Sequence, residues 1–518
     1  MTRPELEETV AALLERGILV PADVAEEAGS RRLAFKHVLI RDVAYEMLPR
    51  AARARRHAEV AAFILDGPGG GEGSSAVVAE HYARSAAYAA EAHLPASEQE
   101  SLRDSALRYG EAAGDAAASL YSNHEALGHY GSAAALAGQD EAAAQRIAEK
   151  TGDIALRLGR VEPAIEAWES CLEYQGRQGE EVHVAELHRK VGAAFAHKGE
   201  RKRAIEHHQQ GINLIKDREP SLTLVRLYED AAWLYVQVGD NMLAIYAAEK
   251  ALRLAEALGE ARAASRAHGI FGRVFGRIGD AAKARENLER AVALARESDA
   301  SETVLALQAL GHNLEHTEGD HEGARARYGE ALALAERIGD VPAQIELHAA
   351  LGQLAFERGE WEEAQRAAEA SAELAEREGL VGKLCVPNVL RGRLRMHEGA
   401  LETASGLFES AAELAEQAGW SEVAAAALMG LASAQEQSGD GAAARATLLE
   451  ALRVCERAGL LPQSVQANAR LAAALLREGD TAAARDAAAR AVEGAERVHD
   501  PAAVAAAAEA EAVLASLE

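Results

Sequence analysis

The sequence is poor in the residues that build disulfide-linked, aromatic-rich or membrane-spanning proteins. Its 518 residues include three cysteines, 11 prolines and only 4% aromatic residues. The cysteines lie far apart and form no CxxC pair, which argues against a disulfide framework or a zinc knuckle. No apolar run approaches the ~20 residues that a transmembrane helix needs, and the N-terminus MTRPELEETV is too acidic for a signal peptide. The sequence therefore predicts a cytoplasmic protein without a membrane span.

Positive charge is also scarce. The chain has 55 basic and 82 acidic residues and a net charge of −27, which argues against a broad nucleic-acid-binding surface. Apolar residues, by contrast, make up 49% of the chain, and many of them are alanine. Because alanine is the best helix former and buries little area per residue, this composition predicts many closely packed helices.

A glycine recurs every 40 residues along most of the chain. The positions are Gly159, Gly199, Gly239, Gly279, Gly319, Gly359, Gly399, Gly439 and Gly479. Alanine follows each of them after five residues, from Ala164 to Ala484. Seven residues before each glycine stands another small residue, with His312 as the one departure. Small residues at fixed positions allow two helices to approach closely, so this period defines a structural repeat.

Each repeat is predicted to be a pair of helices. Aspartate often follows the recurring glycine, as in Gly239-Asp240 and Gly279-Asp280, which is typical of a helix C-cap leading into an N-cap. A second set of glycines, including Gly259 and Gly339, lies half a period away. These breaks divide each unit into two helices of roughly 18 residues.

The pattern resembles the tetratricopeptide repeat (TPR) in a long, 40-residue form, which implies an all-α fold: an α-solenoid in which the repeats form a superhelix. The expected order is a winged-helix-like module at 1–65, a flexible linker at 66–75 and degenerate entry helices at 76–140. Nine repeats follow at 141–498, and a capping helix at 499–518 closes the array.

The segment FKHVLIRDVAYEMLPRAARARRHAEVAAFI at residues 35–64 resembles a junction in large bacterial signalling proteins. In those proteins a STAND-type NTPase domain and a winged-helix-like module precede a TPR array. This chain contains no GxxxxGK[ST] loop, so it lacks the cradle for nucleotide phosphates. The resemblance implies either a fragment of a longer protein or a separate regulatory subunit, with an NTPase domain as a partner in cis or in trans.

One short sequence motif is typical of a class of enzymes. The residues HNLEH at 312–316 have the HxxEH spacing of inverted zinc peptidases, and His321 could add a third ligand. We expect the string to be a chance match within a repeat helix, because His312 occupies the position that should face the partner helix. The sequence therefore predicts no metal, no cofactor and no enzymatic activity.

A partner-binding surface is better supported. A TPR superhelix exposes its first helices on the concave side, where peptides or helices of partners bind. In the third to fifth repeats the expected concave positions combine arginine with an aromatic residue. The predicted partner-binding residues are Arg226, Trp233, Gln237, Arg266, Arg273, Arg277, Asn313 and His316. Guanidinium groups attract carboxylates and phosphates, so an acidic peptide or protein would be the partner. In the alternative interpretation, the arginines pair with acids of neighbouring helices.

Two functional hypotheses follow. In the first, the chain is a non-catalytic scaffold or sensor, the regulatory arm of a STAND-like ATPase that takes part in signal transduction. In the second, it is a DNA-linked transcriptional regulator whose array senses a ligand, with Arg50, Arg53, Arg55 and Arg56 near the DNA backbone. The acidic composition favours the first hypothesis, and nucleic acid is not the expected partner.

Overall fold

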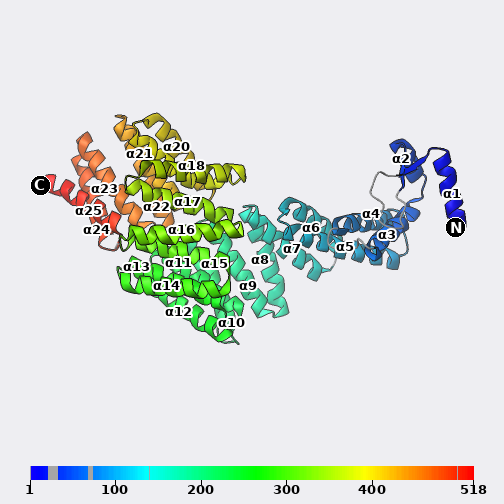
Figure 1. Ribbon diagram of the computed structural model, residues 1–518. Helices are drawn as coiled ribbons and strands as arrows, with labels where there is room; N and C mark the ends of the chain where they lie inside the picture. Colours follow the sequence, from blue (N-terminus) through cyan, green and yellow to red (C-terminus); the bar gives the residue numbers. More distant parts are fainter. Residues whose placement is uncertain (1, 22–32, 68–73, 139, 499, 518) are drawn as a thin grey trace. The chain divides into compact units, whose positions relative to one another are not determined.

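The structure is a computed structural model that describes residues 2–21, 33–67, 74–138, 140–498 and 500–517. Within these ranges it is an all-α solenoid of 25 α-helices with one two-stranded sheet (Figure 1). The chain divides into two compact units, Met1–Cys171 and Leu172–Glu518, which we describe separately. The predicted all-α solenoid is thereby confirmed.

The first unit begins with a small mixed module. Helix α1 (Arg3–Glu15) leads into β1 (Leu19–Pro21), which pairs antiparallel with β2 (Leu33–Phe35), so that Leu19 lies opposite Phe35. Helix α2 (Val38–Glu46) follows β2 directly. Residues 33–46 therefore form a short strand followed by a helix, and residues 22–32 lie outside the described ranges.

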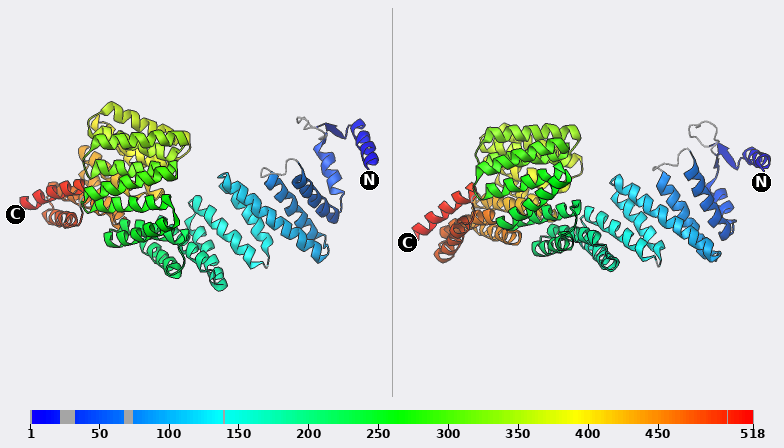
Figure 2. Two further views of the ribbon diagram at one scale, coloured as in Figure 1. Left: turned by 60° about the horizontal axis from the view of Figure 1, so that its bottom comes forward. Right: turned by 90° about the horizontal axis from the view of Figure 1, so that it is seen from below.

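A stack of helices completes the first unit (Figure 2). It comprises α3 (Arg50–Asp66), α4 (Ser75–Glu91), α5 (Ala96–Ser119), α6 (Asn123–Ala137) and α7 (Glu141–Arg157), each packed on the next. The domain boundary predicted at residue 65 divides α3 from α4, yet these two helices pack together as a hairpin. By its packing, α3 belongs to the helical stack. Helix α8 (Val161–Gln178) crosses the division between the two units.

The second unit alternates first and second helices of the repeats. The first helices are α9 (Glu181–His197), α11 (Leu222–Val238), α13 (Ala261–Arg277), α15 (Ala300–His316), α17 (Val341–Glu357), α19 (Cys385–His397), α21 (Ser421–Gln437) and α23 (Leu461–Glu478). A short 3-10 helix, η2 (Val381–Leu384), precedes α19. The second helices are α10 (Arg201–Ile215), α12 (Asn241–Leu258), α14 (Ala281–Ser298), α16 (His321–Ile338), α18 (Trp361–Arg377), α20 (Leu401–Gln417), α22 (Gly441–Ala458) and α24 (Thr481–Ala495). Helix α25 (Pro501–Ser516) packs on α23 and α24.

The turn glycines act as the sequence predicts. Gly239 and Gly259 end their helices in the left-handed region, at φ values of 81° and 72°, where a side chain would be strained. The Asp240 side chain then accepts a hydrogen bond of 3.0 Å from the backbone N–H of Leu243 and caps α12. These local devices fix helix length, and each first helix can therefore contact the first helix of the next repeat.

The small residue before each turn is a point of close helix approach. A Cβ added at Gly272 on α13 would lie 2.4 Å from Cγ of Leu288 on α14. A Cβ at Gly392 on α19 would lie 2.7 Å from Cε1 of Phe408 on α20. The first helix must therefore present a bare backbone to a large side chain of its partner.

One repeat departs from the period by a compensated shift. Only Asp299 separates α14 from α15, whereas Gly259 and Glu260 separate α12 from α13. Four residues then separate α15 from α16, one more than between α13 and α14. Helix α15 therefore starts one residue early, and Gly311 takes the close-packing position, where a Cβ would lie 2.6 Å from Cε1 of Tyr328. The prediction that His312 faces the partner helix is wrong, because His312 is exposed.

The second unit coils far enough to contact itself. Nη1 of Arg201, at the start of α10, donates a 3.3 Å hydrogen bond to the carbonyl of Arg457 at the end of α22. A Cβ at Gly419 would lie 3.4 Å from the carbonyl oxygen of His197, and one at Gly459 would lie 3.5 Å from that of Gln237. The turns of early repeats thus meet the turns of late repeats. We call this meeting of residues 197–203 and 237–238 with residues 419 and 456–459 the closure contact.

Candidate ligand-binding surface

The predicted arginines lie on the inner faces of two neighbouring first helices. Arg226 and Trp233 lie two turns apart on α11, while Arg273 and Arg277 lie one turn apart on α13. Helix α11 packs on α13, so the four side chains share one surface. We call Arg226, Trp233, Arg273 and Arg277 the inner arginine cluster.

The contacts of the cluster include no ion pair among the described residues. The guanidinium carbon of Arg273 lies 4.8 Å from the ring centroid of Trp233, which is 39% exposed. Arg277 donates a hydrogen bond to the carbonyl of Val236. The surrounding protein lowers the pKa of both guanidinium groups by desolvation. Within the described residues, neither these two arginines nor the exposed Arg226 forms an ion pair, so three cations are available to a ligand.

Two other predicted residues are already engaged by neighbours. Nε of Arg266 lies 3.1 Å from a carboxylate oxygen of Glu302, which is buried and also pairs with Arg262. Gln237 accepts a 3.2 Å hydrogen bond from Nε of Arg201. The alternative that arginines pair with acids of neighbouring helices therefore holds for Arg266, but it does not hold for the inner arginine cluster.

The structure separates the last two predicted residues. Asn313 is only 5% exposed and donates a 2.9 Å hydrogen bond to Glu318. Its prediction as a concave residue is wrong, because the early start of α15 turns it toward the helix interface. His316 is exposed, and its ring lies 4.3 Å from that of His312, centroid to centroid. Desolvation, helped by His316 and Arg273, lowers the pKa of His312 to about 3, so this histidine is neutral.

In the HxxEH string, the His316 ring lies 4.3 Å from that of His312, and Nε2 of His316 lies 3.7 Å from a carboxylate oxygen of Glu315. Glu315 is buried, and one of its oxygens accepts a 2.8 Å hydrogen bond from the Tyr328 hydroxyl on α16. Burial raises the pKa of Glu315. Among the residues that the structure describes, no three histidine, cysteine or acidic side chains are placed to hold a metal ion.

Sequence reasoning missed one arginine, Arg393, and did not foresee the environment of Glu229, which stands at an expected concave position ten residues before Gly239. Arg393 on α19 places its guanidinium carbon 4.4 Å from the ring centroid of Phe356; its position six residues before Gly399 could have revealed it. Glu229 on α11 is only 8% exposed, and among the described residues its Oε1 has no hydrogen-bond partner. Burial raises the pKa of Glu229 to about 7, with partial relief from Arg266.

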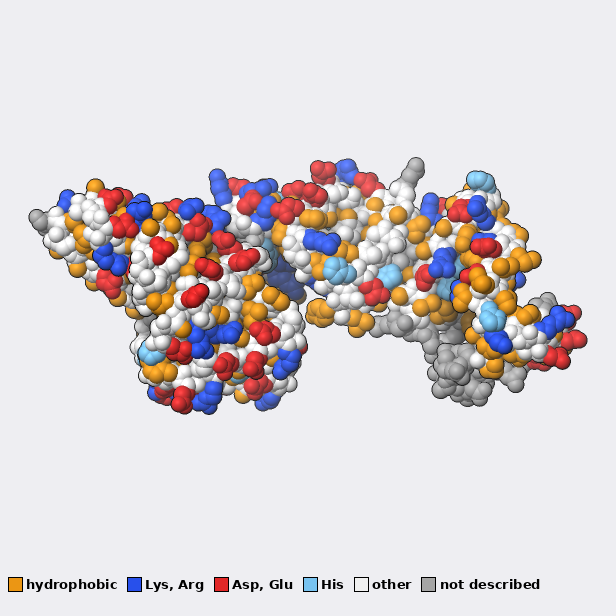
Figure 3. All heavy atoms as spheres, turned by 90° about the horizontal axis from the view of Figure 1, so that it is seen from above, with side chains coloured by type: hydrophobic (Ala, Val, Ile, Leu, Met, Phe, Trp, Pro, Cys, Tyr) orange, Lys and Arg blue, Asp and Glu red, His pale blue; other side chains and the backbone are white. Residues whose placement is uncertain are grey.

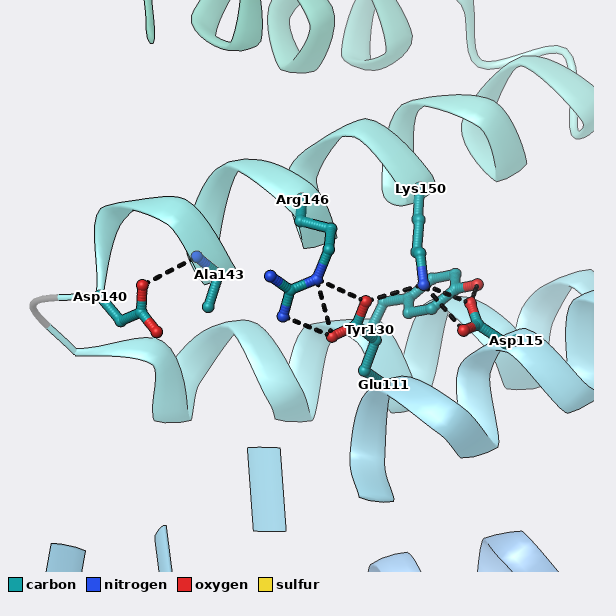
Figure 4. A network of polar contacts seen from close by, with 7 residues as sticks. All are labelled: Glu111, Asp115, Tyr130, Asp140, Ala143, Arg146 and Lys150. Atoms are coloured by element: carbon teal, nitrogen blue, oxygen red, sulfur yellow. Dashed lines mark hydrogen bonds and ion pairs between the residues drawn. The ribbon is translucent and has the colours of Figure 1, made fainter. Parts of the chain in front are cut away.

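A buried acid in the first unit has the opposite environment (Figure 4). Glu111 on α5 is 7% exposed and accepts hydrogen bonds from Arg146 and Lys150 on α7, at distances down to 2.7 Å. The hydrogen bond from Arg146 is the main cause that lowers its pKa. Lys150 also binds Asp115, which accepts a hydrogen bond from Tyr130. This network is complete within the chain and ties α5, α6 and α7 together.

The basic stretch on α3 is also largely satisfied. Arg50 pairs with Glu91 at 3.1 Å, and Arg55 pairs with Glu98 at 2.8 Å. Arg53 donates to the carbonyls of Leu48 and Glu46. Basic and acidic side chains are interspersed over the face in Figure 3, with no broad field of positive charge. The described helices include none that is both long and apolar enough to cross a membrane.

No protein-family model and no curated protein matches the sequence. Solved structures do match in fold. A Rap protein complexed with competence and sporulation factor is 15% identical, with 75% of this chain and 99% of that chain covered and a TM-score of 0.46. Aspartyl phosphate phosphatase F from Bacillus subtilis is 15% identical, with 64% and 90% covered and a TM-score of 0.45. The apo form of RapI is 14% identical, with 53% and 98% covered and a TM-score of 0.42. At these identities and TM-scores the similarity concerns the helical-repeat fold alone.

Proposed function

We propose that the chain is a non-catalytic scaffold or sensor that binds an acidic peptide or protein segment on the inner face of its first helices. One observation carries the proposal. Arg226, Arg273 and Arg277 form no ion pair within the described residues, and Arg273 lies over the exposed Trp233, in a chain with 27 more acids than bases. Because acids outnumber bases in the chain, most arginines are expected to have an acidic partner, and three neighbouring arginines without an ion pair are unusual.

The chemistry of the cluster suits carboxylate or phosphate groups. Guanidinium groups bind such groups through two parallel hydrogen bonds. Trp233 would contact the aliphatic part of a ligand side chain while its ring face stacks with Arg273. Desolvation around the two arginines of α13 strengthens attraction to an anion, because charges interact more strongly where water is excluded.

The finer role, as the regulatory arm of a STAND-like ATPase, is supported by the resemblance of residues 35–64 and by the surface of the first module. Leu39, Met47 and Phe63 are 78%, 80% and 78% exposed. Large apolar side chains at such exposure favour a protein contact in this region. A DNA-linked role has less support, because the arginines on α3 bind acids and carbonyl groups of the chain itself.

Fluorescence polarisation with a labelled peptide of twelve glutamates tests the proposal. We expect binding that weakens with added salt, and the double substitution Arg273→Glu with Arg277→Glu to weaken it at least tenfold, about 1.4 kcal/mol or more. The matched control is Arg253→Glu with Arg290→Glu, which makes the same charge change at exposed positions on the second helices of the same repeats. If both pairs have equal effects, or if the peptide does not bind, the proposal fails.

A further inference from the structure

The closure contact lies next to the inner arginine cluster. Arg201 takes part in the closure contact through the carbonyl of Arg457, and it also bonds Gln237, four residues after Trp233 on α11. The cleft at this contact is lined by Gly199–Arg203, Val238, Glu456, Arg457 and Gly459. The charged surface around the inner arginine cluster therefore continues to the late repeats that the early repeats meet at the closure contact.

The closure contact has little apolar area to stabilise it. Turn glycines meet backbone carbonyls, and the apolar side chain that lines the cleft, Val238, remains 42% exposed. Burial of apolar surface is the main source of stable packing, and an exposed polar contact contributes about 1 kcal/mol or less. The two turns can therefore separate at low cost without unfolding a repeat.

A single acid reaches the cluster from the far side of this contact. Glu422 belongs to the first turn of α21, three residues after Gly419, which lies against the carbonyl of His197. The Glu422 carboxylate is the acid whose charge acts on Arg201, Arg273 and Arg277 alike. Among the described residues it forms no ion pair within 4.0 Å. The charge of Glu422 therefore acts on three cations of α10 and α13 without an ion pair to any of them among the described residues.

We propose that Glu422 is an internal competitor for the inner arginine cluster: an acidic side chain of the partner displaces it, and its displacement loosens the closure contact. The inference rests on the proposed function and adds the regulation of the same site. A ligand carboxylate near Arg273 and Arg277 is repelled by the like charge of Glu422. Glu422 is in the first turn of α21, close to the closure contact, so movement of α21 and its turn, together with rotation of the Glu422 side chain, separates the two acids.

The coupling is reciprocal by thermodynamic necessity. A peptide that favours the open contact binds more tightly to a protein whose contact is already loosened. Removal of the negative charge at Glu422 should therefore have two effects, a tighter complex with an acidic peptide and a looser contact in the free protein.

The first test compares Glu422→Gln with Glu402→Gln, which removes a charge from an exposed position on α20. We expect Glu422→Gln to tighten binding of the twelve-glutamate peptide about two- to fivefold, the size of an exposed charge interaction. Glu402→Gln should leave the affinity unchanged. An unchanged or weakened affinity in Glu422→Gln would overturn the inference.

The second test measures the contact itself without any ligand. Spin labels at Glu206→Cys on α10 and Arg453→Cys on α22, both exposed, report the distance between the two turns. The native cysteines are buried, and burial raises the pKa of Cys385 to about 11 and of Cys455 to about 12, which keeps these thiols unreactive.

We expect a narrow distance distribution in the free protein and a longer component after addition of peptide. The same longer component should appear in Glu422→Gln without peptide and be absent in Glu402→Gln. If Glu422→Gln leaves the distribution unchanged, the inference is wrong even where the peptide binds. If the peptide does not bind the unmodified chain, the proposed function fails, while the distances in Glu422→Gln still decide the role of Glu422.

Discussion

Glu229 offers the sharpest test of the electrostatics of this solenoid. Its carboxyl is buried on α11 with an unpartnered oxygen, and its pKa rises from 4.5 to about 7 because the charged form is desolvated. Arg266 and Arg226 relieve the cost in part, whereas Asp230 and Glu302 add to it. At neutral pH the folded chain therefore holds an acid that would ionise more easily in the unfolded chain.

The linkage between proton binding and folding sets the sign and size of the change in stability that Glu229 causes. Because folding raises the pKa of Glu229, ionisation of this carboxyl does not lower the free energy of unfolding below about pH 4.5. It lowers the free energy of unfolding increasingly as the pH rises through 7. At 1.36 kcal/mol for each tenfold change, the penalty is about 1 kcal/mol at pH 5 and about 3 kcal/mol at pH 8. The Glu229→Gln variant cannot ionise, so it should be more stable than the parent by these amounts.

Urea denaturation followed by circular dichroism at pH 5 and pH 8 measures the difference. A matched control is Glu111→Gln, at a site of equal burial where Arg146 and Lys150 lower the pKa. That substitution should destabilise the chain by about 2 kcal/mol at neutral pH, because hydrogen bonds to charged groups are lost. The loss should shrink as the pH falls and Glu111 of the parent becomes protonated. A Glu229→Gln gain that is equal at pH 5 and pH 8 would refute the reasoning.

Further predictions concern helix packing and salt. Gly272→Ala should destabilise the chain by about 1–3 kcal/mol, because the added Cβ would overlap Leu288. Gly269→Ala on the same helix meets nothing within 4 Å and should stabilise it by about 0.5–1 kcal/mol; equal melting temperatures for the two variants would contradict the close-packing argument. Gly311→Ala should behave like Gly272→Ala, because its Cβ would overlap Tyr328; a neutral effect would contradict the one-residue shift of α15. Affinity for the acidic peptide should fall steadily between about 50 and 300 mM NaCl, since the Debye length shortens over this range; a salt-independent affinity would exclude an electrostatic site.

The periodic features were predictable because they depend on local chemistry. Left-handed glycines end helices, aspartates cap the next helices, and small residues allow close approach, all within about 40 residues of sequence. The spacing along α11 and α13 follows from helical geometry, so the sequence could place Arg226 and Trp233 on one face of α11 and Arg273 and Arg277 on one face of α13. Asn313 could not be placed in this way. The turn before α15 is one residue shorter than in the neighbouring repeat and the turn after it is one residue longer, so the 40-residue spacing of the turn glycines does not change. Only Gly311, one position before His312, gave a signal of the shift.

The sequence by itself determined the repeat, its helix pairs and the face on which the arginines lie, because these follow from contacts between neighbouring residues and neighbouring helices. Tertiary structure alone decided which arginines form ion pairs: Arg266 pairs with Glu302 on the next first helix, while Arg273 lies over the ring of Trp233 and forms no ion pair among the described residues. It also decided that Arg201 reaches Arg457, 256 residues away. That contact depends on the small rotation between successive repeats, which accumulates around the superhelix and which no single repeat encodes.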